Sequence, residues 1–279
     1  MISRKYPLTR LRRLRQSKSI IDLTSESTVS KNDLIQPVFV KEGLSDKEHI
    51  ESMPGIFRFG EDSVLKEIEE INQLGIRAIA IFPVVDPSKK DPKGTEATRR
   101  DNFISRVLGS IKSKFPNILV IADVALDPYT DHGHDGILES DKILNDQTLE
   151  VLAEQSLVLA EAGADIIAPS DMMDGRIGVI RKKLDENNLE DKIILSYAAK
   201  YNSKFYGPFR DAVNSKDNLG TSDKSSYQMN PSNSLEALNE VAMDIEEGAD
   251  IVMVKPGMPY LDIISKVKKN LRFQLLDIK

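Results

Sequence analysis

Hydrophobic residues follow two patterns, which alternate along most of the chain. Segments with apolar residues at i, i+3, i+4 and i+7, such as residues 238–245, end at a glycine, as expected of helices with a C-cap. A short, continuously apolar run then follows and is closed by a proline, as at residues 79–83, 165–169 and 250–256. Continuous apolar runs are typical of strands buried on both faces of a parallel sheet. The pattern therefore predicts repeated βα units.

Three more apolar runs predict strands at residues 34–40, 118–125 and 193–196, and a short segment at 226–229 is a less secure candidate. Together these give seven candidate strands in one domain, because no linker divides them. Repeated βα units fit an open doubly wound sheet or a closed (β/α)8 barrel. No G-x-G-x-x-G motif follows the first strand, so a dinucleotide-binding fold is poorly supported. Polar residues stand at the carboxyl ends of many strands, which converge at the mouth of a barrel. We therefore expect a (β/α)8 TIM barrel.

Composition narrows the possible classes of protein. The 279 residues include no apolar run near the ~20 residues of a membrane span, and no secretory signal peptide is visible. The net charge of -6 argues against general nucleic-acid binding. The absence of cysteine excludes disulfides and cysteine-ligated zinc.

The N-terminal segment differs from the rest of the chain. The first 18 residues carry seven basic side chains and no acid. Such a segment could bind nucleic acid or membrane, act as a targeting peptide, or lie against an acidic neighbouring subunit. It lacks interleaved aromatic residues and the rest of the chain is acidic, so we favour the subunit contact. We expect residues 1–30 to form this arm and residues 31–279 the barrel domain.

Two lysines stand at the ends of predicted strands. Lys255 closes the run 251–254, and Lys200 follows the run 193–199. Burial lowers the pKa of a lysine and leaves part of it as the free amine, which forms a Schiff base with a ketone. The alternative is a lysine whose ammonium reaches out to solvent from the strand end.

Acidic residues form two further candidate sites. Asp127, Asp135 and two histidines belong to a glycine-bearing loop at 123–136, whose oxygen and imidazole groups could hold Mg²⁺, unless it is only a solvated turn. Glu240 lies in a stripe of acids at helical spacing, which indicates a solvated face, a bound cation or a basic partner. Arg210 could hold a substrate carboxylate or form a surface ion pair.

Five segments, in this order and spacing, closely resemble the porphobilinogen synthase (5-aminolevulinate dehydratase) family. They are residues 123–136, 168–178, 196–211, 226–231 and 248–262. The resemblance implies a (β/α)8 barrel whose N-terminal arm embraces a neighbouring subunit, usually in an octamer. It implies that two molecules of 5-aminolevulinate are condensed to porphobilinogen in tetrapyrrole (heme) biosynthesis, in the cytoplasm, with no membrane or nucleic-acid partner.

The resemblance also implies roles for individual residues. Lys200 and Lys255 resemble the two lysines that form Schiff bases, on the propionate and acetate sides respectively. Arg210 and Lys224 resemble the residues that hold a substrate carboxylate. Further substrate contacts are implied at positions that match the family's site: Asp123, Ser170, Tyr197, Phe209 and Gln228.

The acidic loop resembles the aspartate-rich branch of the family, which uses no catalytic zinc. Asp127 and Asp135 stand where the zinc-type members have cysteine, and they would place a hard cation or only hydrogen bonds. Glu240 resembles the ligand of an allosteric Mg²⁺ near a subunit interface.

The end of the chain departs from the family pattern. After Asn270 the family continues with an eighth strand and closing helices, and neither is recognisable in residues 271–279. We therefore expect an incomplete barrel, and a truncated, weakly active or inactive remnant is one alternative function. Another Schiff-base aldolase on the same barrel is a second, which the pair of lysines argues against.

Overall fold

The computed structural model describes residues 4–213, 223–271 and 275–277. The chain divides into two compact units, Met1–Leu34 and Ile35–Lys279. The first unit contains the short helix α1 (Lys18–Leu23) between two 3-10 turns, η1 (Leu11–Arg15) and η2 (Lys31–Asp33). The side chain of Ser17 accepts a hydrogen bond from the Ile20 amide at 3.3 Å and so caps α1.

The second unit is built on a mainly parallel sheet with the strand order β11-β10-β9-β8-β5-β4-β1-β3-β2. Only β2 runs antiparallel to its neighbour in this sheet. A separate antiparallel pair, β6–β7, belongs to the loop after β5. The strands are β1 (Ile35–Lys41), β2 (Lys47–His49), β3 (Phe57–Phe59), β4 (Ala78–Val84), β5 (Leu119–Val124), β6 (Leu138–Glu139), β7 (Lys142–Ile143), β8 (Ile166–Pro169), β9 (Ile193–Lys200), β10 (Ile251–Lys255) and β11 (Leu275–Asp277).

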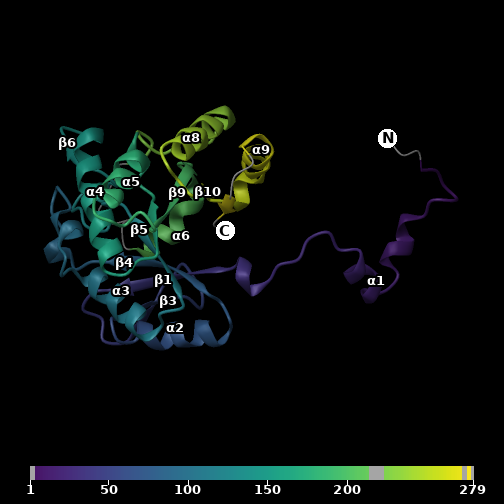
Figure 1. The fold of residues 1–279 in the computed structure, drawn as a ribbon, viewed down its shortest axis with the longest axis horizontal. Helices are drawn as coiled ribbons and strands as arrows, with labels where there is room; N and C mark the ends of the chain where they lie inside the picture. The colour runs from purple at the N-terminus through teal and green to yellow at the C-terminus, as the bar shows by residue number, and fades with distance from the viewer. Residues whose placement is uncertain (1–3, 214–222, 272–274, 278–279) are drawn as a thin grey trace. The chain divides into compact units, whose positions relative to one another are not determined.

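Helices connect the parallel strands and cover one side of the sheet, as Figure 1 shows. Helix α4 packs against β5 and β8, α5 against β9, and α8 against β9 and β10. None of the helices among the described residues is long and apolar enough to cross a membrane. The helices of this unit are α2 (Val64–Gln73), α3 (Phe103–Lys114), α4 (Asn145–Glu161), α5 (Arg176–Asp185), α6 (Gly207–Ala212), α8 (Ser234–Glu246) and α9 (Leu261–Leu271), with 3-10 turns η3 (Pro87–Lys89), η4 (Thr95–Thr98), η5 (Lys204–Tyr206) and η6 (Met258–Tyr260).

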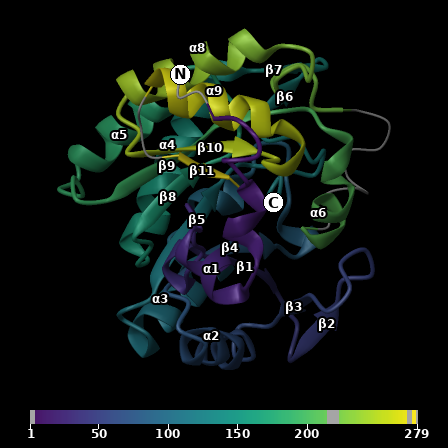
Figure 2. The same cartoon turned by 90° about the vertical axis from the view of Figure 1, so that its right-hand side faces the viewer.

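Alternate residues of each strand enter two different apolar clusters. In β5, Val120 and Ala122 pack with the helices in the larger cluster, while Ile121 belongs to a smaller cluster formed mostly by the strands themselves. In β4, Ile79 and Ile81 likewise join the larger cluster, whereas Phe82 joins the smaller one. This division matches a barrel, in which one row of side chains fills the interior and the other faces the helices. The curvature of the sheet is visible in Figure 2.

A buried ion pair joins two of the covering helices behind β9. Arg176 of α5 and Asp244 of α8 are both 2% exposed, and Arg176 Nη2 lies 3.0 Å from Asp244 Oδ2. Both side chains also hydrogen-bond the hydroxyl of Ser196 on the helix-facing side of β9. Burying this pair is favourable only because its polar atoms find such partners, so the contacts fix how α5 and α8 sit on the strand.

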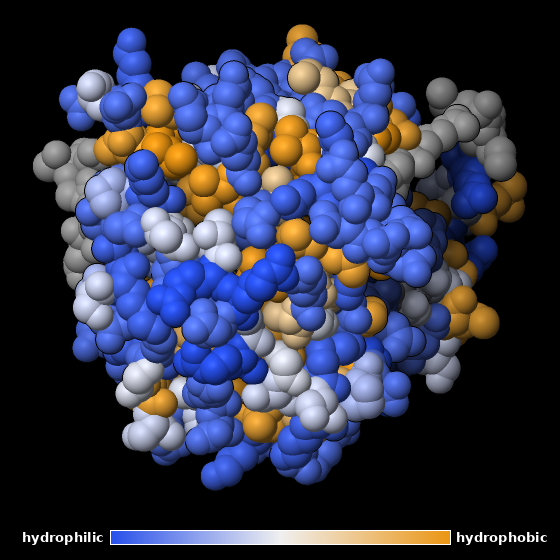
Figure 3. Space-filling view, turned by 60° about the vertical axis from the view of Figure 1, so that its left-hand side comes forward, coloured by the Kyte–Doolittle hydropathy of each residue, from blue (hydrophilic) through white to orange (hydrophobic). Residues whose placement is uncertain are grey.

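Six of the seven predicted strands are confirmed, and the prediction is corrected at two places. Residues 226–229 form no strand, and their contact with β9 is reduced to a single parallel bridge between Tyr201 and Met229. The expected absence of a strand beyond β10 is also wrong, because β11 pairs with β10 in parallel. Polar side chains cover most of the face in Figure 3, with apolar groups scattered between them, as the 29% of charged residues leads one to expect.

Candidate functional site

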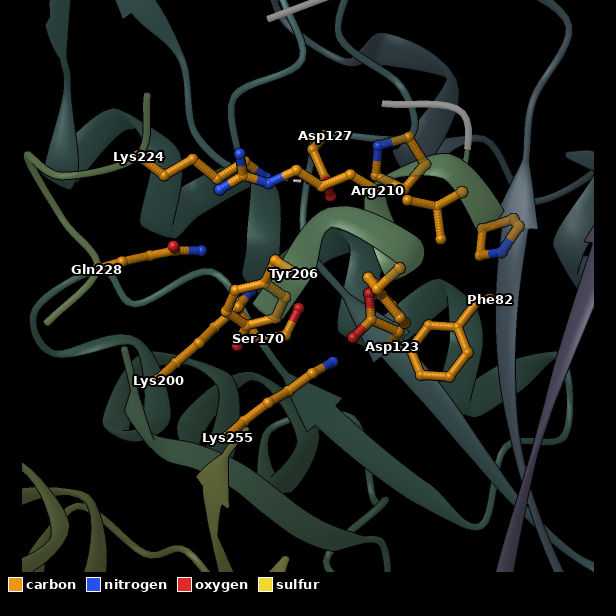
Figure 4. A pocket seen from close by; sticks show the side chains of 14 residues that line it. Phe82, Asp123, Asp127, Ser170, Lys200, Tyr206, Arg210, Lys224, Gln228 and Lys255 are labelled. Carbon is orange, nitrogen blue, oxygen red and sulfur yellow. Dashed lines mark hydrogen bonds and ion pairs between the residues drawn. The ribbon is translucent and has the colours of Figure 1, made fainter. Parts of the chain in front are cut away.

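A pocket lies where the carboxyl ends of five parallel strands meet. Each strand contributes a side chain to it from within two residues of its carboxyl end. Figure 4 shows these side chains converging from different parts of the sheet. They are Phe82 from β4, Asp123 from β5, Ser170 after β8, Lys200 from β9 and Lys255 from β10. The remaining walls come from the loop after β5, from η5 and α6, and from residues 224–228.

The two lysines enter the pocket from neighbouring strands. Lys255 pairs with Lys200 in the β9–β10 register. Lys255 continues the inward row that contains Met253. Simple alternation would place Lys200 with Ser196 on the helix side, because both numbers are even. However, two steps along β10, from Val252 to Val254, match three along β9. The extra residue is a bulge that turns Lys200 to the same side as Lys255.

Lys255 is held in an aromatic cage. It is 4% exposed, and its Nζ lies 4.0 Å from the centroid of the Phe209 ring and 4.9 Å from that of Tyr197. Among the described residues no carboxylate lies within ion-pair distance of this nitrogen. Burial and the nearby charge of Lys200 lower the pKa of Lys255 from 10.5 to about 7. Part of the Lys255 population is therefore free amine at neutral pH, ready to attack a ketone.

Lys200 has polar partners instead. Its Nζ donates a hydrogen bond to the carbonyl oxygen of Ser170 and lies 3.8 Å from Asp135 Oδ2. The side chain is 7% exposed and also approaches the Tyr197 ring, at 5.8 Å from its centroid. The two amines thus border one cavity but differ in surroundings, one among aromatic rings and one beside a carbonyl and a carboxylate.

A third lysine bridges the two loop aspartates. Lys224 Nζ lies 2.6 Å from Asp135 Oδ1 and 3.1 Å from Asp127 Oδ2. Burial alone would lower the pKa of Lys224, but the two carboxylates raise it, so the ammonium stays charged. The expected cation-binding pair therefore holds an ammonium group, and a metal ion could reach both carboxylates only by displacing it. The described residues contain no group of three or more acids or histidines able to hold a metal.

Two buried hydrogen-bond acceptors in the pocket are unsatisfied among the described residues. Asp123 Oδ1 and Gln228 Oε1 are buried, and neither has a hydrogen-bond partner among the described residues. Burial raises the pKa of Asp123 to about 6, against the opposing charge of Lys200. Buried acceptors without donors are costly, so a ligand that brings N–H groups would bind here favourably.

Helix α6 and the residue before it form one wall of the pocket. Phe209 packs edge-on against Phe82, with ring centroids 5.1 Å apart, and Tyr206 precedes the helix with its ring 5.7 Å from Lys255 Nζ. Arg210, next to Phe209, lines the same cavity, and in Figure 4 its side chain extends toward Lys224. Two cationic groups on one wall are suited to a carboxylate ligand.

Most residues expected from the sequence lie at this pocket. Nine of them line it: Asp123, Asp127, Ser170, Lys200, Phe209, Arg210, Lys224, Gln228 and Lys255. Tyr197 supports Lys255, and Asp135 acts through Lys224. Glu240 is apart from them on α8, half-buried, and burial raises its pKa. Sequence reasoning missed Phe82 and Tyr206, although Phe82 ends a predicted strand directly before a proline.

Comparison with known proteins agrees with this geometry. Residues 8–277 match the family model described as delta-aminolevulinic acid dehydratase. The enzyme of that name from Methanothermus sociabilis is 51% identical over 95% of this chain and 81% of its own length. The one from Bradyrhizobium diazoefficiens is 51% identical over 93% of this chain and 73% of its own length.

A solved structure shares the fold as well. The crystal structure of porphobilinogen synthase from Toxoplasma gondii ME49, in complex with the reaction product porphobilinogen, superposes with a TM-score of 0.93 at 44% identity. The match covers 96% of this chain and 76% of that one, which confirms the predicted TIM-barrel-like fold. The chain belongs to the delta-aminolevulinic acid dehydratase family.

Proposed function

We propose that this protein is a porphobilinogen synthase, which condenses two molecules of 5-aminolevulinate to the pyrrole porphobilinogen and releases two waters. One observation carries the proposal. Lys200 and Lys255 are register partners on adjacent strands and both reach into one buried pocket. A reaction that joins two keto acids needs two activated ketones side by side, and two lysines in one cavity supply them.

Each lysine forms a C=N bond to the ketone of one substrate molecule and releases one water. Lys255 begins this step as a free amine near neutral pH, because its pKa is lowered to about 7. The iminium groups then withdraw electrons while the carbon–carbon and carbon–nitrogen bonds of the ring form. Both lysines leave as amines, so the two waters lost at the start are those of the overall reaction.

The walls of the pocket match the rest of the substrate. Arg210 and Lys224 would hold a carboxylate of the substrate bound through Lys200. The unpartnered oxygens of Asp123 and Gln228 would accept hydrogen bonds from the substrate amino groups. The aromatic cage excludes water from Lys255, which favours the dehydrated Schiff base.

A trapping experiment with variants tests the proposal. The protein is incubated with 5-aminolevulinate, part of the sample is reduced with borohydride, and adducts are located by peptide mass spectrometry while porphobilinogen is assayed in the rest. We expect product, and adducts on Lys255 and Lys200. Lys255→Met and Lys200→Met should lose product formation by at least about 10³-fold. Lys204→Met, an exposed lysine of η5, is the matched control.

The same experiment separates the alternatives. Adducts without product would indicate a remnant that binds substrate but does not turn it over. Adducts with unrelated keto acids, and none with 5-aminolevulinate, would favour a different Schiff-base aldolase.

Magnesium is part of the proposal as a regulator. Mg²⁺ keeps most of its water and needs only one or two carboxylates from a protein. The half-buried carboxyl of Glu240 on α8 would supply one such carboxylate. We propose no catalytic zinc.

We further propose that the protein works in the cytoplasm as a homo-oligomer, with an octamer as the expected state. The arm exposes basic and apolar side chains together, among them Leu8, Leu11 and Leu23 at 85%, 60% and 84% exposure. Exposed leucines at this density suit a protein partner better than solvent. Native mass spectrometry of the chain with and without residues 1–30 tests this: loss of the oligomer on deletion is expected, and an unchanged oligomer would refute the role of the arm.

A further inference from the structure

The segment that carries Phe209 and Arg210 is held from outside the pocket by one buried arginine. Arg58 belongs to β3, which lies between β1 and the edge strand β2 at the end of the sheet opposite β11, and is 7% exposed. Its Nε donates to the carbonyl oxygen of Ala212 at 2.7 Å, and its Nη2 donates to that of Asp211. These two residues lie more than 150 positions away in the chain, so the contact forms only in the folded protein.

The position of the guanidinium matches what the end of a helix requires. The last carbonyls of a helix have no partner within it, and a cation there is stabilising. Ala212 is the last residue of α6, so Arg58 supplies both the missing donors and the charge. Glu48 of β2 orients the guanidinium from the other side, with Arg58 Nη1 2.6 Å from Glu48 Oε1.

The loop between β2 and β3 holds the same helix at a second point. The amide of Ser52 donates to Asp211 Oδ2 at 3.2 Å, and its hydroxyl donates to the same atom and, at 3.4 Å, to the carbonyl of Pro208. Hydrogen bonds therefore hold α6 near both of its ends. Met53 and Ile56 of the loop pack on the cluster that contains Ala212.

Phe209 and Arg210 lie between these two anchor points. Phe209 covers Lys255, and Arg210 faces the cavity. A shift of α6 would move both side chains at once, and a displacement of about 1 Å can cost 10²-fold in rate.

We propose that Arg58 is a positioning residue for the proposed reaction: by fixing the carbonyls of Asp211 and Ala212 it sets Arg210 against the substrate carboxylate and Phe209 against Lys255. Arg58 touches no substrate. The inference rests on the proposed function for the identity of the substrate, whereas the anchoring of α6 can be measured without any substrate.

The test is a double-mutant cycle on KM. Arg58→Gln should raise KM for 5-aminolevulinate about tenfold, equivalent to about 1.4 kcal/mol. Arg210→Ala should raise KM in the native background but add less than about threefold in the Arg58→Gln background, since Arg210 is then already out of place. If Arg58 only stabilised the fold, the effects of Arg58→Gln and Arg210→Ala on KM would multiply. Multiplicative effects, or an unchanged KM in folded Arg58→Gln, would overturn the proposal.

Two further variants keep the result interpretable. Arg58→Lys retains the charge but cannot serve three acceptors in a fork, so it should behave like Arg58→Gln. Should either variant fail to fold, Ser52→Ala decides the matter through the same cycle. Lys41→Gln is the control: it removes the other cation bound to Glu48, at Oε2, and leaves α6 untouched, so KM should not change.

Hydrogen exchange separates this proposal from the proposed function. The Val213 amide donates to the carbonyl of Phe209 at the end of α6. Its exchange should speed up at least tenfold in Arg58→Gln and stay the same in Lys41→Gln. Unchanged exchange in Arg58→Gln would refute the anchoring even in an active enzyme. A native protein that forms neither adduct nor product would refute the function and leave the anchoring result standing.

Discussion

Replacing Lys200 with methionine should raise the pKa of Lys255. The Nζ atoms of Lys200 and Lys255 lie 5.8 and 4.9 Å from the centroid of the Tyr197 ring. The two nitrogens are therefore at most about 11 Å apart, where two unit charges at an effective dielectric of about 20 repel by about 1.5 kcal/mol. This repulsion corresponds to about one pKa unit, and a shorter separation makes it larger. Methionine keeps the length of the side chain and removes only the charge.

The pKa of Lys255 can be followed through its reactivity. The initial rate of borohydride-trapped adduct formation at Lys255 is measured by peptide mass spectrometry between pH 5.5 and 10, at one fixed keto acid concentration. The native protein should show a midpoint near pH 7, since the pKa of Lys255 is lowered to about 7. Lys200→Met should move that midpoint upward by about one unit or more. The exposed Lys204→Met should leave it in place.

Two results would contradict this prediction. A native midpoint above about 9 would mean that Lys255 is an ordinary solvated lysine. A midpoint that stays the same or falls in Lys200→Met would mean that the charge of Lys200 does not act on Lys255. Burial, the larger of the two causes, would then account for the lowered pKa alone.

Three other substitutions have definite expected outcomes. Phe209→Ala admits water to Lys255, and because burial is the main cause of its lowered pKa, the adduct midpoint should rise; an unchanged midpoint would mean that Phe209 does not shield the amine. Asp244→Ala removes the nearer of the two carboxylates beside the buried Arg176 guanidinium and leaves only Asp171, 3.8 Å away, so it should lower the free energy of unfolding in urea by about 3 kcal/mol. Glu186→Ala, from an exposed pair, should change it by less than about 0.5 kcal/mol. Glu240→Gln should abolish Mg²⁺ activation and weaken Mg²⁺ binding at least tenfold by calorimetry, and equal binding would place the ion elsewhere.

The strands and the site were predictable from the sequence where burial follows the local pattern. Continuous apolar runs ending in a polar residue identified β5, β9 and β10, and with them Asp123, Lys200 and Lys255. Their convergence follows from the architecture, because the carboxyl ends of parallel strands meet at one edge.

The orientation of Lys200 could not be read from the sequence. Alternation from Ser196 places Lys200 on the helix side, and only the bulge in β9 brings it to the pocket. A bulge depends on how two strands settle against each other, which no local pattern of residues 193–200 encodes. The apolar run identified the lysine and the resemblance to a known family implied its role, but neither explains how it points inward.

Long-range polar contacts could not be predicted from the sequence either. Arg58 lies in a three-residue strand, and nothing nearby indicates that its partners are the carbonyls of Asp211 and Ala212. The predicted strand at 226–229 failed for a similar reason. Gln228 and Lys224 turn toward the pocket, and the backbone follows them instead of pairing along β9.

The burial of Lys255 has a consequence for the whole fold. In the unfolded chain this lysine regains a pKa near 10.5, so between pH 7 and 10.5 the unfolded form binds a proton that the native form lacks. The native state is therefore disfavoured in acid by this one group and recovers as the pH rises, by an amount on the order of a few kcal/mol. The burial that makes the Lys255 nitrogen reactive near neutral pH therefore also lowers the stability of the native state there.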